Sequence, residues 1–110
     1  MNLNHIHLGV RDLRTALDWL DRIWQLKPQF QSDRMATIPF GSFILILDVA
    51  EADSCATVGF DTDDCDRDYR AVLGRGAVAL SPPINQPWGV RAAYVQGPGR
   101  LKFEIEGPQR

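Results

Sequence analysis

The chain has 110 residues, of which 45% are hydrophobic and 24% are charged, and its formal net charge is −2 at pH 7. Acidic and basic residues are mixed along the chain, and without a basic stripe we expect neither nucleic acid nor a membrane as a partner. The longest aliphatic and aromatic run, Phe43–Leu47, is too short for a bilayer, and the first residues lack the pattern of a secretory signal, so we expect a cytoplasmic protein.

The length of the chain allows one hydrophobic core without metal or disulfide support, so we expect a single domain over residues 1–110. Cys55 and Cys65 fit no disulfide framework or zinc motif and are expected to be reduced thiols. His5 and His7 are the only histidines, which limits every possible metal site.

Hydrophobic periodicity in the first half of the chain predicts a strand, a helix and three further strands. Side chains alternate between two faces over Leu3–Val10, as in a half-buried strand. Asp12 is placed to cap a helix with apolar residues at helical spacing, which should end near Leu26, before Pro28. Three short strands follow, with a Gly-Ser turn between the last two: Gln29–Ser32, Met35–Phe40 and Phe43–Val49.

The same order of elements returns in the second half. A strand is expected over Cys55–Asp61 and a helix over about Asp64–Leu73. The proline-rich segment Pro82–Trp88 is expected to be a loop between two of the three strands that follow, which are Ala77–Ser81, Val90–Gln96 and Leu101–Glu106.

The two halves align as a repeat. When His5 is aligned with Thr57, the expected helix cap Asp12 is aligned with Asp64. In the final strands of the two halves, Ile46 corresponds to Glu104. The repeat indicates two βαβββ modules, at about residues 3–49 and 55–106. The expected fold class is α+β, with the modules forming a cupped, partly closed mixed sheet and the helices outside. Residues expected to face the hollow of the cup are His5, His7, Ile46, Thr57, Gly59, Lys102 and Glu104.

Three segments of the sequence carry a resemblance to a known family. They are the opening NHIHLGVRDL (residues 4–13), Trp88-Gly89 before a strand, and YVQGPGRLKFE (residues 94–104) in place of an aromatic-x-x-Asp-Pro-Asp-Gly-x-x-x-Glu pattern. In this order and spacing the chain resembles the vicinal oxygen chelate superfamily, the glyoxalase/bleomycin resistance protein/extradiol dioxygenase family, over nearly its whole length. Its members include metal-dependent enzymes and metal-free proteins that sequester bleomycin-type antibiotics.

The resemblance implies a metal position that this chain fills incompletely. Metal-using members hold a divalent ion with two histidines and a glutamate, whose positions here are His5, Thr57 and Glu104. A threonine hydroxyl is a poor substitute for imidazole, and Ile46 stands at a fourth position that some members use. We therefore expect no cofactor. The alternative is a Mn, Fe, Ni or Zn ion held by His5 and Glu104, with His7 replacing the missing ligand.

Other residues are candidates for contact with a ligand. Glu104 is either a general base or a charge partner inside the cup, and Tyr94 is either an acid/base phenol or a packed strand aromatic. Trp88 could close over a planar ligand, and Arg91 either binds an anionic group or lies at an exposed strand end. The catalytic role stays open, with Glu104 and Tyr94 as candidates, and the predicted ligand-binding residues are His5, His7, Thr57, Trp88, Arg91, Tyr94 and Glu104.

The favoured function is binding of a small molecule without metal, similar to the bleomycin-binding branch, to sequester or carry a small, partly aromatic ligand. The substitution at Thr57 is the main reason. The alternative is a metal-dependent lyase, isomerase or dioxygenase that uses His5, Glu104 and His7. A regulatory module with a vestigial pocket is a third possibility. The resemblance also implies a homodimer, in which the cup is formed either within one chain or by both chains together.

Overall fold

The computed structural model describes Met1 and residues 3–110, and the chain divides into two compact units. The first half is Met1–Ser54 and the second half is Cys55–Arg110, and each is described by itself. The boundary falls just before the point at which the second module was predicted to begin. That the two modules form one domain with a shared cup stays a prediction.

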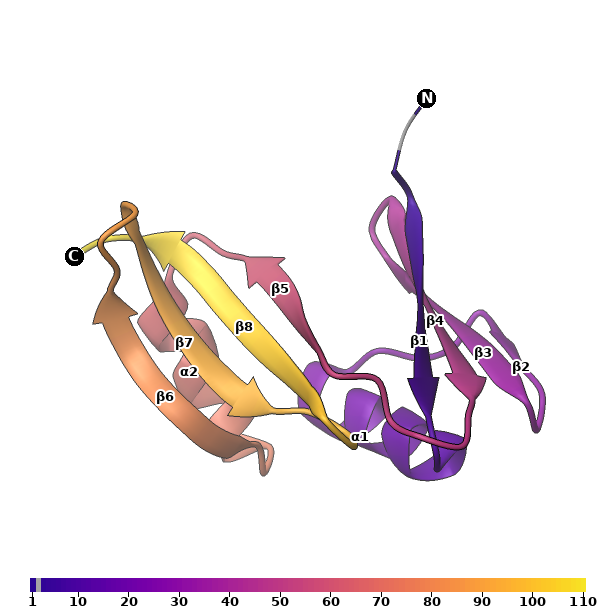
Figure 1. The fold of residues 1–110 in the computed structure, drawn as a ribbon. Coiled ribbons are helices and arrows are strands. Elements are labelled where there is room, and N and C mark those ends of the chain that lie inside the picture. Colours follow the sequence, from indigo (N-terminus) through magenta and orange to yellow (C-terminus); the bar gives the residue numbers. More distant parts are fainter. Residues whose placement is uncertain (2) are drawn as a thin grey trace. The chain divides into compact units, whose positions relative to one another are not determined.

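The first half consists of a strand, a helix and three strands (Figure 1). Its four-stranded sheet has the order β1-β4-β3-β2, with β1 parallel to β4 and the other neighbours antiparallel. The elements are β1 (His5–Val10), α1 (Leu13–Trp24), β2 (Phe30–Gln31), β3 (Met35–Phe40) and β4 (Phe43–Val49).

Both ends of α1 follow from local chemistry. Asp12 caps the helix, because its Oδ1 accepts a hydrogen bond from the backbone N–H of Thr15 at 3.0 Å. The helix ends at Trp24, since Gln25 adopts a left-handed conformation with φ of 57°. The predicted helix end near Leu26 is therefore about two residues beyond the observed end. Pro28 is visible in the sequence as a stop, whereas a left-handed residue other than glycine gives no clear sequence signal.

The second half repeats the same order of elements and the same topology (Figure 1). Its sheet has the order β5-β8-β7-β6, and β5 is parallel to β8. The elements are β5 (Ala56–Asp61), α2 (Cys65–Gly74), β6 (Val78–Asn85), β7 (Val90–Gln96) and β8 (Leu101–Pro108). The predicted α+β class with two βαβββ modules and mixed sheets is confirmed.

The strand registers confirm the alignment of the two halves. His5 lies opposite Ile44 on β4, and its counterpart Thr57 lies opposite Lys102 on β8. Two residues further along each strand pair, His7 faces Ile46 in the first half, and Gly59 faces Glu104 in the second half.

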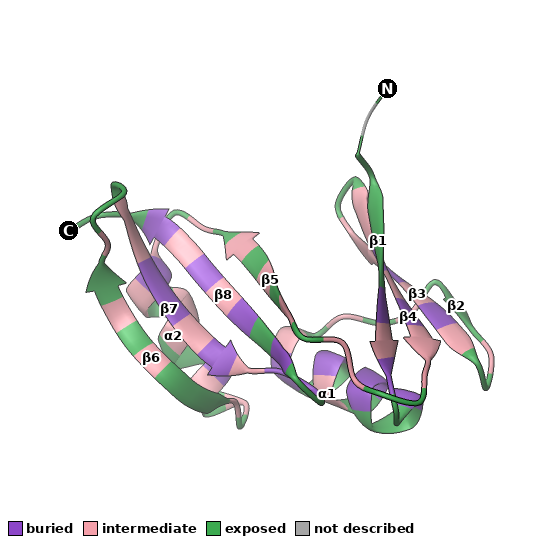
Figure 2. Cartoon of the chain, viewed as in Figure 1, coloured by how far each residue is buried: buried purple, intermediate pink, exposed green. Residues whose placement is uncertain are grey.

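Each sheet has one buried apolar face and one more polar face. Along β8 the buried Leu101, Phe103 and Ile105 alternate with Lys102 and Glu104, and Figure 2 shows this alternation. The helix α2 contacts β6, β7 and β8. In the first half, Leu8 and Val10 of β1 are buried with apolar residues of β3 and β4, whereas His5 and His7 are exposed.

One predicted loop is partly a strand. The segment expected to loop from Pro82 continues β6 as far as Asn85. The prolines are tolerated because β6 is an edge strand, and the register shifts on either side of Ser81 interrupt its ladder with β7. The strand predicted as Gln29–Ser32 shortens to the two residues of β2. In the part of the chain that the structure describes, no helix is long and apolar enough to cross a membrane.

Candidate functional site

Most of the candidate residues lie on β1 in the first half and on β5, β7 and β8 in the second half. His5 and His7 belong to β1 in the first half. Thr57, Tyr94 and Glu104 belong to β5, β7 and β8 in the second half. The two sets therefore belong to different halves, and their convergence in one cup stays a prediction.

Tyr94 and Glu104 form a hydrogen-bonded pair across two strands. The residues are direct partners in the antiparallel register of β7 and β8, and the Tyr94 hydroxyl donates to Glu104 Oε2 at 2.7 Å. This bond, together with burial and the nearby negative charge, raises the pKa of Tyr94 to about 12. The phenol therefore stays protonated at neutral pH and acts as a hydrogen-bond donor.

The Glu104 carboxylate occupies space that a glycine leaves open on the neighbouring strand. Gly59 is the direct partner of Glu104 in the parallel β5–β8 register, and a Cβ at Gly59 would lie 3.3 Å from Glu104 Oε1. Beside it is an open depression of about 220 Å³, lined by Gly59, Phe60, Asp61, Glu104 and Glu106. The sequence signal for this close approach is a glycine inside a strand.

The donors in the second half do not fit the metal set implied by the fold family. Thr57 offers a neutral hydroxyl where an imidazole or carboxylate is needed, and one oxygen of Glu104 already accepts a hydrogen bond from the Tyr94 hydroxyl. Over Met1 and residues 3–110, no cluster of three or more His, Cys, Asp or Glu side chains could hold a metal ion.

The two histidines of β1 form their own small cluster. His7 Nδ1 lies 2.8 Å from Asp48 Oδ2 on β4, and His5 Nδ1 lies 2.7 Å from Asn4 Oδ1. The ring centres of His5 and His7 are 5.6 Å apart in an edge-to-face arrangement. The contact between His7 and Asp48 was not predicted, because the two residues are 41 positions apart in the sequence.

Arg91 and Trp88 have different surroundings. The Arg91 guanidinium donates to both carboxylate oxygens of Asp66 on α2, at 2.7 and 3.1 Å, and the two side chains are only 19% and 15% exposed. The pair lowers the pKa of Asp66 and gives Arg91 a structural partner. Trp88, in the turn between β6 and β7, is 63% exposed.

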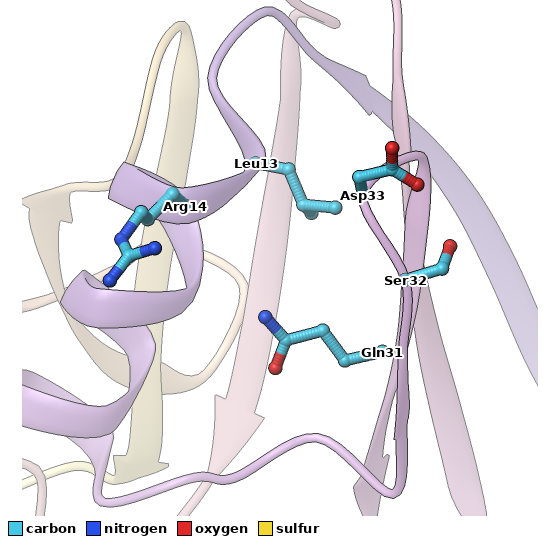
Figure 3. A pocket seen from close by; sticks show the side chains of 5 residues that line it. All are labelled: Leu13, Arg14, Gln31, Ser32 and Asp33. Atoms are coloured by element: carbon cyan, nitrogen blue, oxygen red, sulfur yellow. The ribbon is translucent and has the colours of Figure 1, made fainter.

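A larger depression lies in the first half, between the first turn of α1 and the β2–β3 turn. It has a volume of about 530 Å³, and Figure 3 shows the five side chains around it: Leu13, Arg14, Gln31, Ser32 and Asp33. None of these five residues was a predicted site residue, because no motif or periodicity links the start of the helix to this turn.

Comparison with solved structures shows which fold these modules make. A glyoxalase/bleomycin resistance protein/dioxygenase from Nocardioides matches 100% of this chain and 85% of its own at 20% identity, with a TM-score of 0.85. A member of the same superfamily from Sphaerobacter thermophilus matches 97% of each chain at 22% identity, with a TM-score of 0.82. A lactoylglutathione lyase from Agrobacterium tumefaciens matches 96% of this chain and 92% of its own at 15% identity, with a TM-score of 0.83.

No model of a protein family matches the sequence, and no curated protein matches it. The chain has the fold of the glyoxalase/bleomycin resistance protein/dioxygenase superfamily, which confirms the predicted resemblance at the level of the fold. At sequence identities of 15–22%, this structural similarity establishes the fold and does not assign an activity to the chain.

Proposed function

We propose that the protein binds a small molecule without a metal ion, on the polar sheet face of the second half. The observation that carries this proposal is the hydrogen bond from Tyr94 to Glu104 at 2.7 Å. A glutamate that would serve as a metal ligand in a metal-using relative is held here by a neutral phenol.

The residues on this face suit a ligand with its own hydrogen-bonding groups. Glu104 Oε1 accepts from a donor or cation, because Oε2 is occupied by Tyr94. Thr57 and Lys102 are partners in the β5–β8 register and offer a hydroxyl and an ammonium group. Two strands fix the Tyr94–Glu104 pair, so little side-chain freedom is lost on binding.

The proposed ligand is small and partly aromatic, and it is sequestered or carried. Support comes from the exposed Trp88, whose indole offers a stacking surface in the same half. Contacts of the ligand with His5 and His7, which the sequence led us to expect, stay a prediction. Arg91 is left out, since Asp66 holds its guanidinium.

We also propose a homodimer. Three large apolar residues of the edge strand β6 are exposed, and an exposed apolar edge favours cover by another chain: Val78, Leu80 and Ile84. Light scattering coupled to size exclusion tests this, and a monomer at all concentrations would contradict it.

A binding screen in EDTA tests the proposed function. Small aromatic amines and amides are titrated into ¹⁵N-labelled protein, and backbone shifts are followed around Glu104 and Gly59. Binding should persist in EDTA and weaken at least tenfold in Glu104→Gln and Tyr94→Phe. Glu51→Gln, at an exposed position of the first half, is the control and should leave binding unchanged. Stoichiometric metal that is lost in Glu104→Gln would contradict the proposal and favour the lyase, isomerase or dioxygenase alternative.

A further inference from the structure

The geometry points to a separate site in the first half, at which His5 and His7 together hold one divalent transition-metal ion through their Nε2 atoms. This inference goes beyond the proposed function, which concerns residues of the second half and needs no metal. His7 lies outside the metal positions that the family resemblance implies, and all contacts in the argument are within Met1–Ser54.

Hydrogen bonds leave the Nε2 atoms of both rings available. An ionised carboxylate has no proton to donate, so the 2.8 Å contact with Asp48 Oδ2 requires a proton on His7 Nδ1. The amide oxygen of Asn4 likewise only accepts, so the 2.7 Å contact requires a proton on His5 Nδ1. In the neutral form each imidazole then carries its lone pair on Nε2, which is the state that binds a metal.

The spacing of the rings suits one ion. Residues two apart on a strand point to the same face, and the ring centres of His5 and His7 are 5.6 Å apart. With a metal–nitrogen distance of about 2.0–2.1 Å, the ring centres of two imidazoles on one ion are at most roughly 6.4 Å apart. The observed separation is within this limit.

The surroundings resemble the support that a metal-binding histidine requires. A carboxylate on the second nitrogen fixes the tautomer and orients the ring. Asp48 supplies this carboxylate to His7 from β4. Both histidines are exposed, so an ion can reach them and keep other coordination positions open.

The chemistry of the donors selects the metal class. Imidazole suits Cu²⁺, Ni²⁺ and Zn²⁺, whereas Mg²⁺ and Ca²⁺ prefer oxygen ligands. Two imidazoles leave at least two positions for water or for a donor atom of a bound ligand.

Zinc titration of the full chain without a histidine tag tests the inference, because His5 and His7 are the only two histidines that could respond. Calorimetry gives the stoichiometry, and ¹⁵N spectra of the histidine rings identify the nitrogen that binds. One Zn²⁺ per chain should bind with a shift of both Nε2 signals. His5→Ala and His7→Ala should each weaken binding at least tenfold.

Three further variants show which carboxylates contribute to the zinc site. Asp48→Asn should weaken zinc binding about tenfold. Glu51→Gln removes the same charge from an exposed position nearby in the chain and should change the affinity less than twofold. Glu104→Gln should leave zinc binding unchanged. Far-UV circular dichroism confirms that each variant is folded.

Zinc binding that persists in His7→Ala would overturn the inference. A parent protein that binds no zinc at millimolar Zn²⁺ would overturn it as well. If Asp48→Asn and Glu51→Gln change the zinc affinity equally, Asp48 does not orient His7 for metal binding. Loss of zinc binding in Glu104→Gln would show that the metal site includes Glu104 of the second half. It would overturn the two-histidine site and would also contradict the proposal that Glu104 acts without a metal. Failure of the two-histidine site alone leaves the proposed function intact.

Discussion

The two halves of the chain use one backbone plan for different chemistry. In both halves the first strand pairs in parallel with the last, and equivalent residues occupy equivalent registers. In the first half this strand pair carries two imidazoles and Asp48. In the second half it carries a carboxylate beside a glycine, joined to a phenol from β7. The hydrogen-bonded frame therefore fixes where side chains meet, while the residue types decide what they can bind.

The largest effect should come from the equivalent core positions. Phe103 on β8 and Leu45 on β4 are both fully buried, at 0% and 1% exposure. Phe103→Ala should lower the free energy of unfolding by about 3–5 kcal/mol and Leu45→Ala by about 2–5 kcal/mol, because each leaves a cavity. Urea unfolding measures both. Lys102→Ala, on the opposite face of β8, should change the free energy of unfolding by less than about 0.5 kcal/mol. A loss as large as that of Phe103→Ala would contradict the assignment of the two faces.

The next effect concerns the Tyr94 proton. In a Tyr69→Phe background, which leaves one tyrosine, absorbance should give a titration midpoint near the pKa of about 12. Glu104→Gln should move this pKa toward the ordinary value of about 10, because the charged acceptor is lost.

The same pKa difference fixes a stability change in alkali. The folded state keeps the Tyr94 proton to a higher pH than the unfolded chain does. Its contribution to stability is therefore present below about pH 10 and is lost as the pH rises toward 12. The Glu104→Gln variant should lack this loss, and an unchanged alkaline profile would contradict a dominant role for Glu104.

A smaller effect is expected at Gly59. A methyl group in Gly59→Ala would lie 3.3 Å from Glu104 Oε1, so the carboxylate must shift by a few tenths of an ångström. The Tyr94 pKa should then fall between that of the parent and that of Glu104→Gln. Gly74→Ala, whose added Cβ meets nothing within 4 Å, should leave it unchanged. An unaltered pKa in Gly59→Ala would show that the carboxylate does not depend on this space.

The smallest effect concerns the ion pair of α2. The hydrogen bond from Arg91 lowers the pKa of Asp66, so its stabilisation is present above the unfolded pKa of about 3.9 and is lost as the pH falls through the lower folded value. Asp66→Asn should flatten the fall in stability below about pH 4. Acid unfolding followed by circular dichroism measures this. The exposed Asp33→Asn is the control, and identical profiles for the two variants would contradict the ion-pair account.

Periodicity and capping residues were enough to predict the order of elements and the internal repeat. Alternation along Phe43–Val49 and the cap at Asp12 correspond to β4 and the start of α1. The continuation of β6 past Pro82 was missed, because proline signals a break unless the strand is known to be an edge.

The site was predictable as single residues but not as pairs. Glu104 and Tyr94 were candidates, yet their bond depends on the antiparallel register of β7 and β8. The contact of His7 with Asp48 depends on parallel pairing of strands 41 residues apart, which no local pattern encodes. Arg91 was predicted as a ligand-binding residue because the sequence does not show its ion pair with Asp66. Asp66 lies on α2, which packs against β7, the strand of Arg91.

The division of chemistry between the halves is tested most directly by one NMR titration with Zn²⁺, in which the Glu104 side-chain carboxyl carbon and the ring nitrogens of both histidines are observed together. We expect the Nε2 signals of His5 and His7 to move to saturation at one equivalent while the Glu104 signal stays in place. Movement of the Glu104 signal at the same equivalence point would contradict this expectation, because the carboxylate held by Tyr94 would then be a metal ligand.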